Sequence, residues 1–544
     1  MLSLIHGGSP NFKLMKSRNQ LLTIFYLLIF SGIGFAQITY YKTYGDWSGE
    51  RATTLIQTSD GGFITAGYTG SFGAAGYADC YIIKTDFFGD TLWTKTYGTL
   101  ERDYPSSILQ TSDGGYVFAG SIQNNATIDH IIYAMRTDSI GNILWNKTYI
   151  PVGSNSAWSR AILPASDGGY VIGGTTHFTA GYEDPFLLKI DTNGTVFWSK
   201  TYGGIYFDAG YSFKETNDGG YVIVGFTGNF GVGSSDIYLI KTDTVGAVQW
   251  SKTYGGINQD VGLSIQQTLD NGYIIAGYTQ SFGAGNRDIY LIKTDINGNT
   301  QWSKAYGGTN SDMANYVQQT IDGGYILGGT TQSFGAGVMD VYLVKTDSFG
   351  DTLWTKAIGD TAYDYCNVVQ ETIDGGYIVA GSRNDDAYLV KTDANGNSGC
   401  NESSTNTIVT SPSTQTTNPA TIENTSSILS TNSPFSVGNG GIITAFCFSD
   451  GIPEPLDNDI IITIYPNPFR TSATIIFNSE LRIQNAELTM YDVMGREVLK
   501  LPIINYQLSI IRGNLKSGMY FCKVTGDKGQ GAKEIICTGK IIAE

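Results

Sequence analysis

The sequence lacks most of the residues and motifs on which enzyme active sites depend. Its 544 residues include only three histidines, His6, His130 and His177. Few side chains are therefore present that could act as the general base of a catalytic triad. A Gly-rich phosphate loop with lysine, an HExxH zinc motif, a CxxC pair and a GxSxG nucleophile elbow are all missing. These absences favour a binding protein over an enzyme.

Positive charge is also scarce. The chain has 33 Lys and Arg against 49 Asp and Glu, its formal net charge is −16, and no run of basic residues follows the N-terminal segment. Nucleic acid is therefore not an expected partner. The abundant residues are 69 Gly, 35 Tyr and 25 Phe, which indicate β-structure joined by many tight turns.

Long apolar runs are absent except for one near the N-terminus. Two basic residues precede the run LLTIFYLLIF at 21–30, and small residues follow it. This order is typical of a secretory signal, and the run is too short for a good membrane span. We expect residues 1–36 to be a signal peptide read from Met15, and the exported chain to start at Gln37 without a transmembrane segment.

Export would place the six cysteines in an oxidising environment. Two pairs are disulfide candidates, one flanking a Ser/Thr/Asn-rich stretch and the other a probable hairpin turn, although sequence alone leaves the connectivity open. The candidate pairs are Cys400 with Cys447 and Cys522 with Cys537. Cys80 and Cys366 lie inside repeats and are expected to be buried thiols.

A unit of about 52 residues occurs seven times, the last time in a shortened form. A DGG turn phrase and a later K/R-x-D phrase mark each unit, and a tryptophan follows in six units. The turn aspartates are Asp60, Asp113, Asp167, Asp218, Asp270, Asp322 and Asp374. The later aspartates are Asp86, Asp138, Asp191, Asp243, Asp295, Asp347 and Asp393. Strand-forming repeats of this length indicate the blades of a β-propeller.

Each repeat is expected to form four strands, named A to D. In the fifth repeat these are LSIQQT (263–268), YIIAGYT (273–279), IYLIKTD (289–295) and TQWSKAYGG (300–308). Strands B and C are apolar on both faces, as expected for a sheet packed between two others.

Seven sets of strands A to C occur, but only six Trp-bearing strands D follow them. The opening phrase TYYKTYG (39–45) aligns with QWSKTYG (249–255) and places Tyr40 in the tryptophan position. We therefore predict an all-β fold: a seven-bladed β-propeller over 37–396, closed by an N-terminal strand that completes the last blade. The phrase KTDxxGxxxW resembles the tryptophan-docking phrase of quinoprotein-type propellers, and TxDGG loosely resembles the Asp-box of sialidase-type propellers. Both resemblances imply an architecture and carry no activity.

The composition changes after the repeats. Residues 397–457 are rich in Ser, Thr and Asn and are expected to form a linker. A β-pattern then predicts a small β-sandwich at 458–544. Its phrases YPNPF, YDVMGREV, SGMYFCKV and a terminal GK closely resemble the C-terminal sorting domain of the type IX secretion system of Bacteroidetes.

This resemblance implies a route and a partner. Such proteins cross the inner membrane through their N-terminal signal and the outer membrane through the type IX machinery, which recognises the C-terminal domain. The cargo is then released or attached to the cell surface. An ordinary accessory β-sandwich is the alternative interpretation of residues 458–544.

Acidic residues recur where the D–A connectors and B–C loops share one end of the propeller. The connectors provide Glu50, Asp103, Asp208, Asp260, Asp312 and Asp364, and the starts of strand C provide Asp79, Asp129, Asp184, Asp236, Asp288, Asp340 and Asp386. Calcium or a polyhydroxylated ligand is one interpretation of this ring. The favoured alternative is that each carboxylate accepts backbone N–H bonds in its loop.

The repeat symmetry breaks in the B–C loops of repeats two, three and seven. His130 and His177 lie in adjacent repeats near this end, so a metal site with Asp129 or Asp184 is a weak candidate. We expect no other cofactor.

Two function hypotheses follow. The first is a secreted or surface-attached propeller that binds an extracellular glycan or protein through its loops. The second is an extracellular hydrolase of polysaccharide, which would need two unique carboxylates in one cleft. The repeated acids favour the first.

Overall fold

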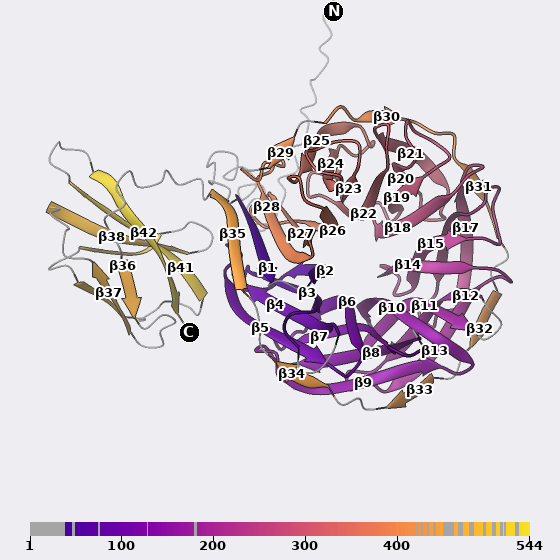
Figure 1. Cartoon of the computed structure of the whole chain (residues 1–544), viewed down its shortest axis with the longest axis horizontal. Coiled ribbons are helices and arrows are strands. Elements are labelled where there is room, and N and C mark those ends of the chain that lie inside the picture. Colours follow the sequence, from indigo (N-terminus) through magenta and orange to yellow (C-terminus); the bar gives the residue numbers. More distant parts are fainter. Residues whose placement is uncertain are drawn as a thin grey trace, which may run out of the picture. The chain divides into compact units, whose positions relative to one another are not determined.

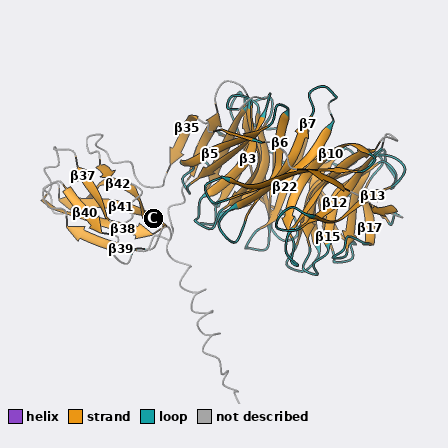
Figure 2. Cartoon of the chain, turned by 90° about the horizontal axis from the view of Figure 1, so that it is seen from below, coloured by secondary structure: helices purple, strands orange, loops and turns teal. Residues whose placement is uncertain are grey.

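The structure is a computed structural model. It describes residues 39–45, 49–73, 77–127, 129–178, 182–399, 401–403, 405–419, 422–425, 428–431, 435–438 and 442–449, and within 462–543 the C-terminal strands with Leu515. Only strands and their connections occur in these ranges (Figure 2), and none of the described residues forms a helix able to cross a membrane. The expected signal peptide lies outside the described residues.

The repeats form seven antiparallel blades arranged in a ring (Figure 1). Blade 1 is β2 (Glu50–Gln57), β3 (Phe63–Thr69), β4 (Asp79–Thr85) and β5 (Thr91–Gly98). Blade 2 is β6 (Arg102–Gln110), β7 (Tyr116–Gln123), β8 (His130–Thr137) and β9 (Ile143–Pro151). Blade 3 is β10 (Ser154–Pro164), β11 (Tyr170–Phe178), β12 (Glu183–Ile190) and β13 (Val196–Gly203), and blade 4 is β14 (Asp208–Glu215), β15 (Tyr221–Thr227), β16 (Asp236–Thr242) and β17 (Val248–Gly255). Blade 5 is β18 (Asp260–Gln267), β19 (Tyr273–Thr279), β20 (Asp288–Thr294) and β21 (Thr300–Gly307); blade 6 is β22 (Asp312–Gln319), β23 (Tyr325–Thr331), β24 (Asp340–Thr346) and β25 (Thr352–Ile358); blade 7 begins with β26 (Asp364–Glu371), β27 (Tyr377–Arg383) and β28 (Asp386–Thr392). Strand A is innermost and strand D lies further out.

Strands B and C are buried on both faces, as predicted. In blade 5 every residue of β20 is buried, and its apolar side chains belong to two core clusters, one on each side of the blade. Adjacent blades therefore share their cores, and the ring is one continuous apolar structure.

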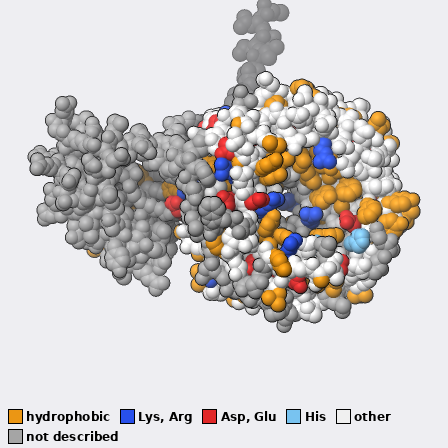
Figure 3. All heavy atoms as spheres, in the orientation of Figure 1, with side chains coloured by type: hydrophobic (Ala, Val, Ile, Leu, Met, Phe, Trp, Pro, Cys, Tyr) orange, Lys and Arg blue, Asp and Glu red, His pale blue; other side chains and the backbone are white. Residues whose placement is uncertain are grey.

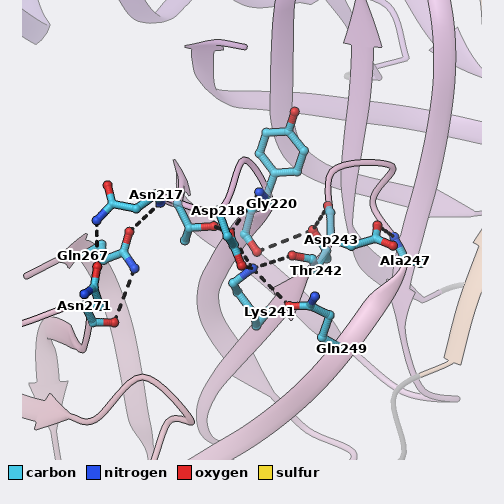
Figure 4. Close-up of polar contacts among 12 residues, drawn as sticks. Asn217, Asp218, Gly220, Lys241, Thr242, Asp243, Ala247, Gln249, Gln267 and Asn271 are labelled. Carbon is cyan, nitrogen blue, oxygen red and sulfur yellow. Dashed lines mark hydrogen bonds and ion pairs between the residues drawn. The ribbon is translucent and has the colours of Figure 1, made fainter. Parts of the chain in front are cut away.

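The two repeated sequence marks meet in an ion pair at the A–B turn. Lys241 of strand C is buried, and its Nζ lies 2.9 Å from Asp218 Oδ2 in the DGG turn (Figure 4). Asp218 Oδ1 also accepts hydrogen bonds from Thr216 and from the Gly220 N–H. The ion pair thereby holds the A–B turn against strand C of the same blade, which explains why the DGG phrase and the K/R-x-D phrase both recur.

Strand D ties each blade to the next. Tyr254 donates a hydrogen bond of 2.6 Å to the Gly298 carbonyl in the C–D turn of the following blade. Trp250 packs against the same glycine and leaves no room for a side chain there: a Cβ added to Gly298 would lie 2.8 Å from Trp250 Cζ3. The positive φ of Gly298, 74°, is a further reason for glycine at this turn.

The N-terminal strand closes the ring, as predicted. Strand β1 (Thr39–Gly45) pairs with β28 of blade 7, and Tyr44 donates to the Gly89 carbonyl of blade 1 at 2.6 Å. Tyr40 occupies the tryptophan position, since a Cβ on Gly89 would lie 2.8 Å from Tyr40 Cε2. Blade 7 is thus completed by residues from the start of the propeller.

The structure corrects the expected linker at 397–457. Residues 402–449 add a fifth strand to every blade, and we call these strands the belt. They are β29 (Glu402–Ser403) on β25, β30 (Ile408–Thr410) on β21, β31 (Gln415–Thr417) on β17, β32 (Ile422–Thr425) on β13, β33 (Ile428–Thr431) on β9, β34 (Ser436–Gly438) on β5 and β35 (Ile442–Ser449) on β1. The belt follows the outside of the ring in the order of blades 6, 5, 4, 3, 2, 1 and 7.

Hydroxyl groups help to fix the belt on its blades. Thr253 and Thr417 share a hydrogen bond of 2.6 Å, and Thr148 and Thr431 share one of 2.8 Å. A Ser/Thr-rich composition is compatible with strands of two to eight residues here, because threonine is β-branched and one side of the belt faces solvent. The segment was expected to be irregular because it has no hydrophobic alternation.

The C-terminal region contains two further antiparallel sheets. The first is β36 (Ile462–Tyr465), β37 (Ser472–Phe477) and β40 (Gln507–Ile511); the second is β39 (Glu497–Pro502), β38 (Gln484–Asp492), β41 (Gly518–Asp527) and β42 (Lys533–Ala543). Leu488, Met490 and Tyr520 of the second sheet are buried. The packing of both sheets as a sandwich remains a prediction.

Candidate functional site

The D–A connectors and B–C loops lie at one end of the ring, which we call the loop face. Six of the seven blade junctions carry a carboxylate pair there. One acid comes from the start of strand C and the other from the start of strand A in the next blade. The pairs are Asp79–Asp103, Asp184–Asp208, Asp236–Asp260, Asp288–Asp312, Asp340–Asp364 and Asp386–Glu50.

Several of these carboxylates accept hydrogen bonds from the loops around them. Asp236 Oδ2 accepts from the N–H groups of Val232 and Gly233 at 2.9 and 3.1 Å. Asp260 Oδ2 accepts from the Gly256 N–H at 2.8 Å and from Ser281 Oγ at 2.7 Å. Asp236 and Asp260 therefore have the loop-supporting role that was the favoured alternative.

Burial raises the pKa of several of the paired acids. Desolvation raises the pKa of Asp103 and of Asp184 to about 7, and the neighbouring Asp208 adds to the rise at Asp184. Desolvation also raises the pKa of Asp208 and of Asp364 to about 6, against the lowering effect of their hydrogen bonds. These side chains titrate near neutral pH in the folded chain.

The histidine candidates do not form a metal centre with their proposed partners. The His130 ring lies 4.9 Å from Trp158, and its backbone N–H donates to Ser156 Oγ. His177 is opposite Glu183 in the ladder of β11 and β12. Across the described ranges, no three His, Cys, Asp or Glu side chains are grouped so that they could hold a metal ion.

The two aspartates proposed as metal ligands also lie in other surroundings. Asp184 faces Asp208 at the junction of blades 3 and 4. Asp129 precedes β8 and is not the counterpart of the other acids: the ladder pairs Ile132 with Tyr149 as it pairs Ile237 with Tyr254. Ile131 therefore occupies the acid position of blade 2, two residues after Asp129, and the strand itself begins at His130.

The structure tests only some of the cysteine predictions. Cys80 and Cys366 are free and buried, as expected, and burial raises the pKa of both thiols. Cys400 lies outside the described residues, and only the backbone is described at the other three candidates. In the register of β41 and β42, Cys522 is opposite Gly539 and Cys537 is opposite Val524, so the pair is diagonal. The disulfides remain predictions.

A second group on the loop face was missed by sequence reasoning. It consists of arginines and aromatic residues on the innermost strands and their neighbours, and we call it the inner rim. Its members are Arg51, Tyr68, Tyr104, Trp158, Arg160, Tyr211, Phe226, Tyr278, Arg287 and Tyr365. Figure 3 shows Lys and Arg side chains gathered with apolar ones around the central hollow.

The guanidinium groups of the inner rim lie on tyrosine rings. Arg160 lies 5.2 Å from the centroid of Tyr211, and Arg287 lies 4.7 Å from that of Tyr278. Tyr211 also stacks on Phe226 at 6.0 Å. Desolvation among the surrounding strands lowers the pKa of Arg160, although its side chain is exposed to solvent. This run extends over blades 3, 4 and 5.

The part of the inner rim in blades 7 and 1 also has an arginine beside a tyrosine ring, but an aspartate neutralises the charge of this arginine. Arg51 lies 5.8 Å from the centroid of Tyr365 and forms an ion pair of 2.8 Å with Asp385. Within the described part of the chain, no ion-pair partner is found for Arg160 or Arg287. Two stacked guanidinium groups are therefore left for an anionic ligand.

A further apolar group projects from the loop face between blades 3 and 4. Tyr182 of the B–C loop contacts Tyr206 and Phe207 of the D–A connector, with both ring distances 6.2 Å. Tyr206 and Phe207 are 53% and 47% exposed. We call these three residues the aromatic patch, and no other connector of the ring has two adjacent aromatic residues.

The sequence did contain a signal for these residues. Between 37 and 400 the chain has six arginines. Four of them are on strand ends or connectors of the loop face, namely Arg51, Arg102, Arg287 and Arg383, and Arg160 is in the middle of β10. None of these positions holds arginine in another repeat. A search for positions where the repeats differ would have found them.

Comparison with known proteins identifies one region. Residues 463–538 match the family described as "Secretion system C-terminal sorting domain", so the C-terminal region is a type IX sorting domain, as predicted. The regulatory protein FlaEY of Caulobacter vibrioides is 23% identical over 184 residues, which cover 29% of this chain and 19% of that protein. The chain thus spans well under two thirds of that relative.

Solved structures give only distant likenesses. One is PorZ, titled an essential bacterial surface component of the type IX secretion system of Porphyromonas gingivalis, with a TM-score of 0.35, 10% identity and coverage of 89% of this chain and 58% of that one. Another is the extracellular domain of the one-component system BT4673 of B. thetaiotaomicron, with a TM-score of 0.24, 10% identity and coverage of 91% and 74%. TM-scores this low support no conclusion about the function of this chain.

Proposed function

We propose that this chain is an exported binding protein whose propeller takes an acidic polysaccharide on its loop face. The observation that carries the proposal is the inner rim, where Arg160 and Arg287 are stacked on tyrosines and form no ion pair with any residue that the structure describes. Guanidinium groups on aromatic rings suit carboxylates or sulfates. The loop face therefore has the chemistry of a site for anions.

The aromatic patch supports a sugar over a simple anion. Exposed aromatic rings give flat apolar surfaces on which the C–H faces of a pyranose can pack. Tyr206 and Phe207 offer such a surface on the same face as the inner rim. A chain of acidic sugars would use both kinds of contact.

Binding can be tested with polygalacturonate, using its fully methyl-esterified form as the uncharged control. We expect saturable binding of the charged form, and weaker binding as salt increases. R160A and R287A should each weaken binding about tenfold, which corresponds to about 1.4 kcal/mol. R136A is the matched control, because Arg136 lies at the opposite end of its strand with Asp113.

The outcome can contradict the proposal directly. Equal binding of the charged and esterified polymers would remove the role of the arginines, and unchanged affinity in R160A and R287A would remove the inner rim as the site. Y206A/F207A separates the two groups, because loss of binding there alone would move the site to the aromatic patch.

The hydrolase remains the less favoured alternative. The acids repeated around the loop face are buried pairs with backbone donors, whereas a polysaccharide hydrolase needs two unique carboxylates in one cleft. Release of reducing ends from polygalacturonate by the purified chain would favour it over the binding protein.

The route of export rests on the sorting domain. That domain implies recognition by the type IX machinery and delivery to the cell surface or the medium, and we propose a cleavable N-terminal signal for the first membrane. A reporter fused ahead of residues 458–544 should reach the outside of a type IX-competent cell. Retention of the reporter in the periplasm would contradict this role.

A further inference from the structure

The acid pairs at the blade junctions are buried against a shared glycine. At the junction of blades 4 and 5, a Cβ added to Gly255 would lie 2.0 Å from Asp236 Oδ1 and 2.7 Å from Asp260 Oδ2. The two acids are 1% and 0% exposed. The next junction repeats this arrangement, with distances of 2.0 and 2.8 Å from Gly307 to Asp288 and Asp312. Two carboxylates thus occupy the space that a side chain would otherwise fill.

At the junction of blades 4 and 5, the described residues provide no cationic side chain that balances the two acids. No Lys, Arg or His of the described ranges forms an ion pair with Asp236 or Asp260. Nor do the described residues provide a hydrogen-bond partner for Oδ1 of Asp236 or Oδ1 of Asp340. Burying an ionised carboxylate without a partner costs several kcal/mol, and two adjacent carboxylates also repel each other.

The seventh junction shows what the fold does without acids. At the boundary of blades 2 and 3, the register places Ile131 at the strand C acid, Ile150 at the glycine and Ala157 at the strand A acid. Three positions from three strands have become apolar together. The glycine and the two acids are therefore one unit, present or replaced as a whole.

The hydrogen bonds of the pairs favour the ionised form of both acids. The N–H groups of Val232 and Gly233 donate to Asp236 Oδ2, and the Gly256 N–H and Ser281 hydroxyl donate to Asp260 Oδ2. Donors directed at a carboxylate stabilise its charge. The pair Asp236–Asp260 has donors on one side and carboxylate oxygens without a partner among the described residues on the other. Two such carboxylates can serve as ligands of a cation.

We propose that four of the junction pairs each bind one divalent cation, and that Ca²⁺ is the physiological one. These pairs are Asp184–Asp208, Asp236–Asp260, Asp288–Asp312 and Asp340–Asp364. Carboxylate oxygens suit hard cations, and Ca²⁺ accepts irregular oxygen shells completed by water or backbone carbonyls. The ion joins strand C of one blade to strand A of the next and removes the repulsion within the pair. The cations are structural and stand apart from the proposed polysaccharide site.

The test measures Ca²⁺ uptake by the purified full chain after EDTA treatment, by equilibrium dialysis up to about 5 mM free Ca²⁺. We expect saturable uptake approaching four ions per chain and a higher melting temperature in Ca²⁺ than in EDTA. D236N/D260N, combined with D288N/D312N and D340N/D364N, should reduce the uptake by about three quarters. D351N is the matched control, since Asp351 is an exposed acid at a C–D turn.

A second set of variants keeps the test decisive if the asparagine variants do not fold. D236I/G255I/D260A copies the apolar junction that the chain already contains, so it should fold and lose one ion. Absence of saturable Ca²⁺ uptake, or unchanged uptake in the combined asparagine variant, would overturn the proposal. Proton uptake on lowering the pH without Ca²⁺ uptake would instead show pairs that share a proton.

Discussion

The Tyr41 hydroxyl donates a hydrogen bond of 2.7 Å to Asp364 Oδ1, across 323 residues of sequence. Tyr41 belongs to the first strand of the propeller, and Asp364 is the first residue of the last blade. This buried contact lies inside blade 7, beside the pairing of β1 with β28. The ring is therefore closed by specific side-chain contacts as well as by backbone pairing.

The first prediction concerns this closure. Y44F removes the hydrogen bond to the Gly89 carbonyl and should lower the free energy of unfolding by about 1 kcal/mol. Y254F removes the equivalent bond inside the ring and is the matched control. Deletion of 38–45 should lower the melting temperature sharply, because it removes the whole strand. Equal melting of the deletion variant and the parent chain would contradict the closure.

The second prediction is a pH dependence of stability. The pKa values of Asp103 and Asp184 are about 7 when folded, and those of Asp208 and Asp364 are about 6, all above the ordinary value of 3.8. A raised pKa contributes stability that is complete below the unfolded value and is lost as pH rises through the folded value. In EDTA the melting temperature should therefore rise when the pH is lowered from about 8 to about 5. A flat profile over this window would contradict the prediction.

The same profile should depend on calcium if the junctions bind it. A bound cation favours the ionised pairs and lowers their pKa values, so saturating Ca²⁺ should flatten the curve between about pH 5 and 8. The combined asparagine variant should be flatter than the parent chain in EDTA. Calorimetry of both proteins across this range measures the two effects together.

The third prediction concerns the ion pair of the A–B turn. Burial opposes the ionisation of Asp218, but hydrogen bonds from Thr216 and Lys241 outweigh burial and lower its pKa. D218A leaves the Lys241 ammonium buried without its carboxylate and should cost more than K241M, which leaves only an exposed aspartate. We expect about 3 kcal/mol for D218A and about 1 kcal/mol for K241M, measured by denaturant unfolding. The reverse order would show that the lysine stem and not the charge stabilises the turn.

The fourth prediction concerns the belt. Replacing 415–417 by Gly-Pro-Gly should release β31 and expose the edge of β17, because proline cannot donate to the ladder. Hydrogen exchange should then accelerate in β17 and remain unchanged in β14, which lies on the inner side of the same blade. The same replacement at 408–410 provides a matched variant on blade 5. Unchanged exchange in β17 would mean that the belt does not protect the blade.

The sequence was sufficient to predict the propeller and its closure because the repeats are compared within one chain. Tyr40 could be assigned to a tryptophan position since six other strands D define that position. The belt could not be predicted, because each of its strands pairs with a different blade and has no periodicity of its own. Its threonines bond to hydroxyls such as Thr253 and Thr148, and such contacts have no signature in the sequence.

The candidate site was predicted only in part, for a related reason. The acids recur in nearly every repeat and were placed correctly at the loop face, but their pairing joins strand C of one blade to strand A of the next. Asp129 was assigned by proximity to the strand, and the register shows that Ile131 holds the position. The inner rim is made of residues that differ from their counterparts, and a search for repetition overlooks such residues.

Strand β1 lies between β28 and β35 in one sheet, and its first residue, Thr39, is opposite Ser449, the last residue of the belt. The two ends of the propeller sequence are therefore neighbours, so a short bridge between them would give a chain without ends. New termini could then be opened in any B–C loop, and the circular permutants would contain the same blades, belt and closure in a different order.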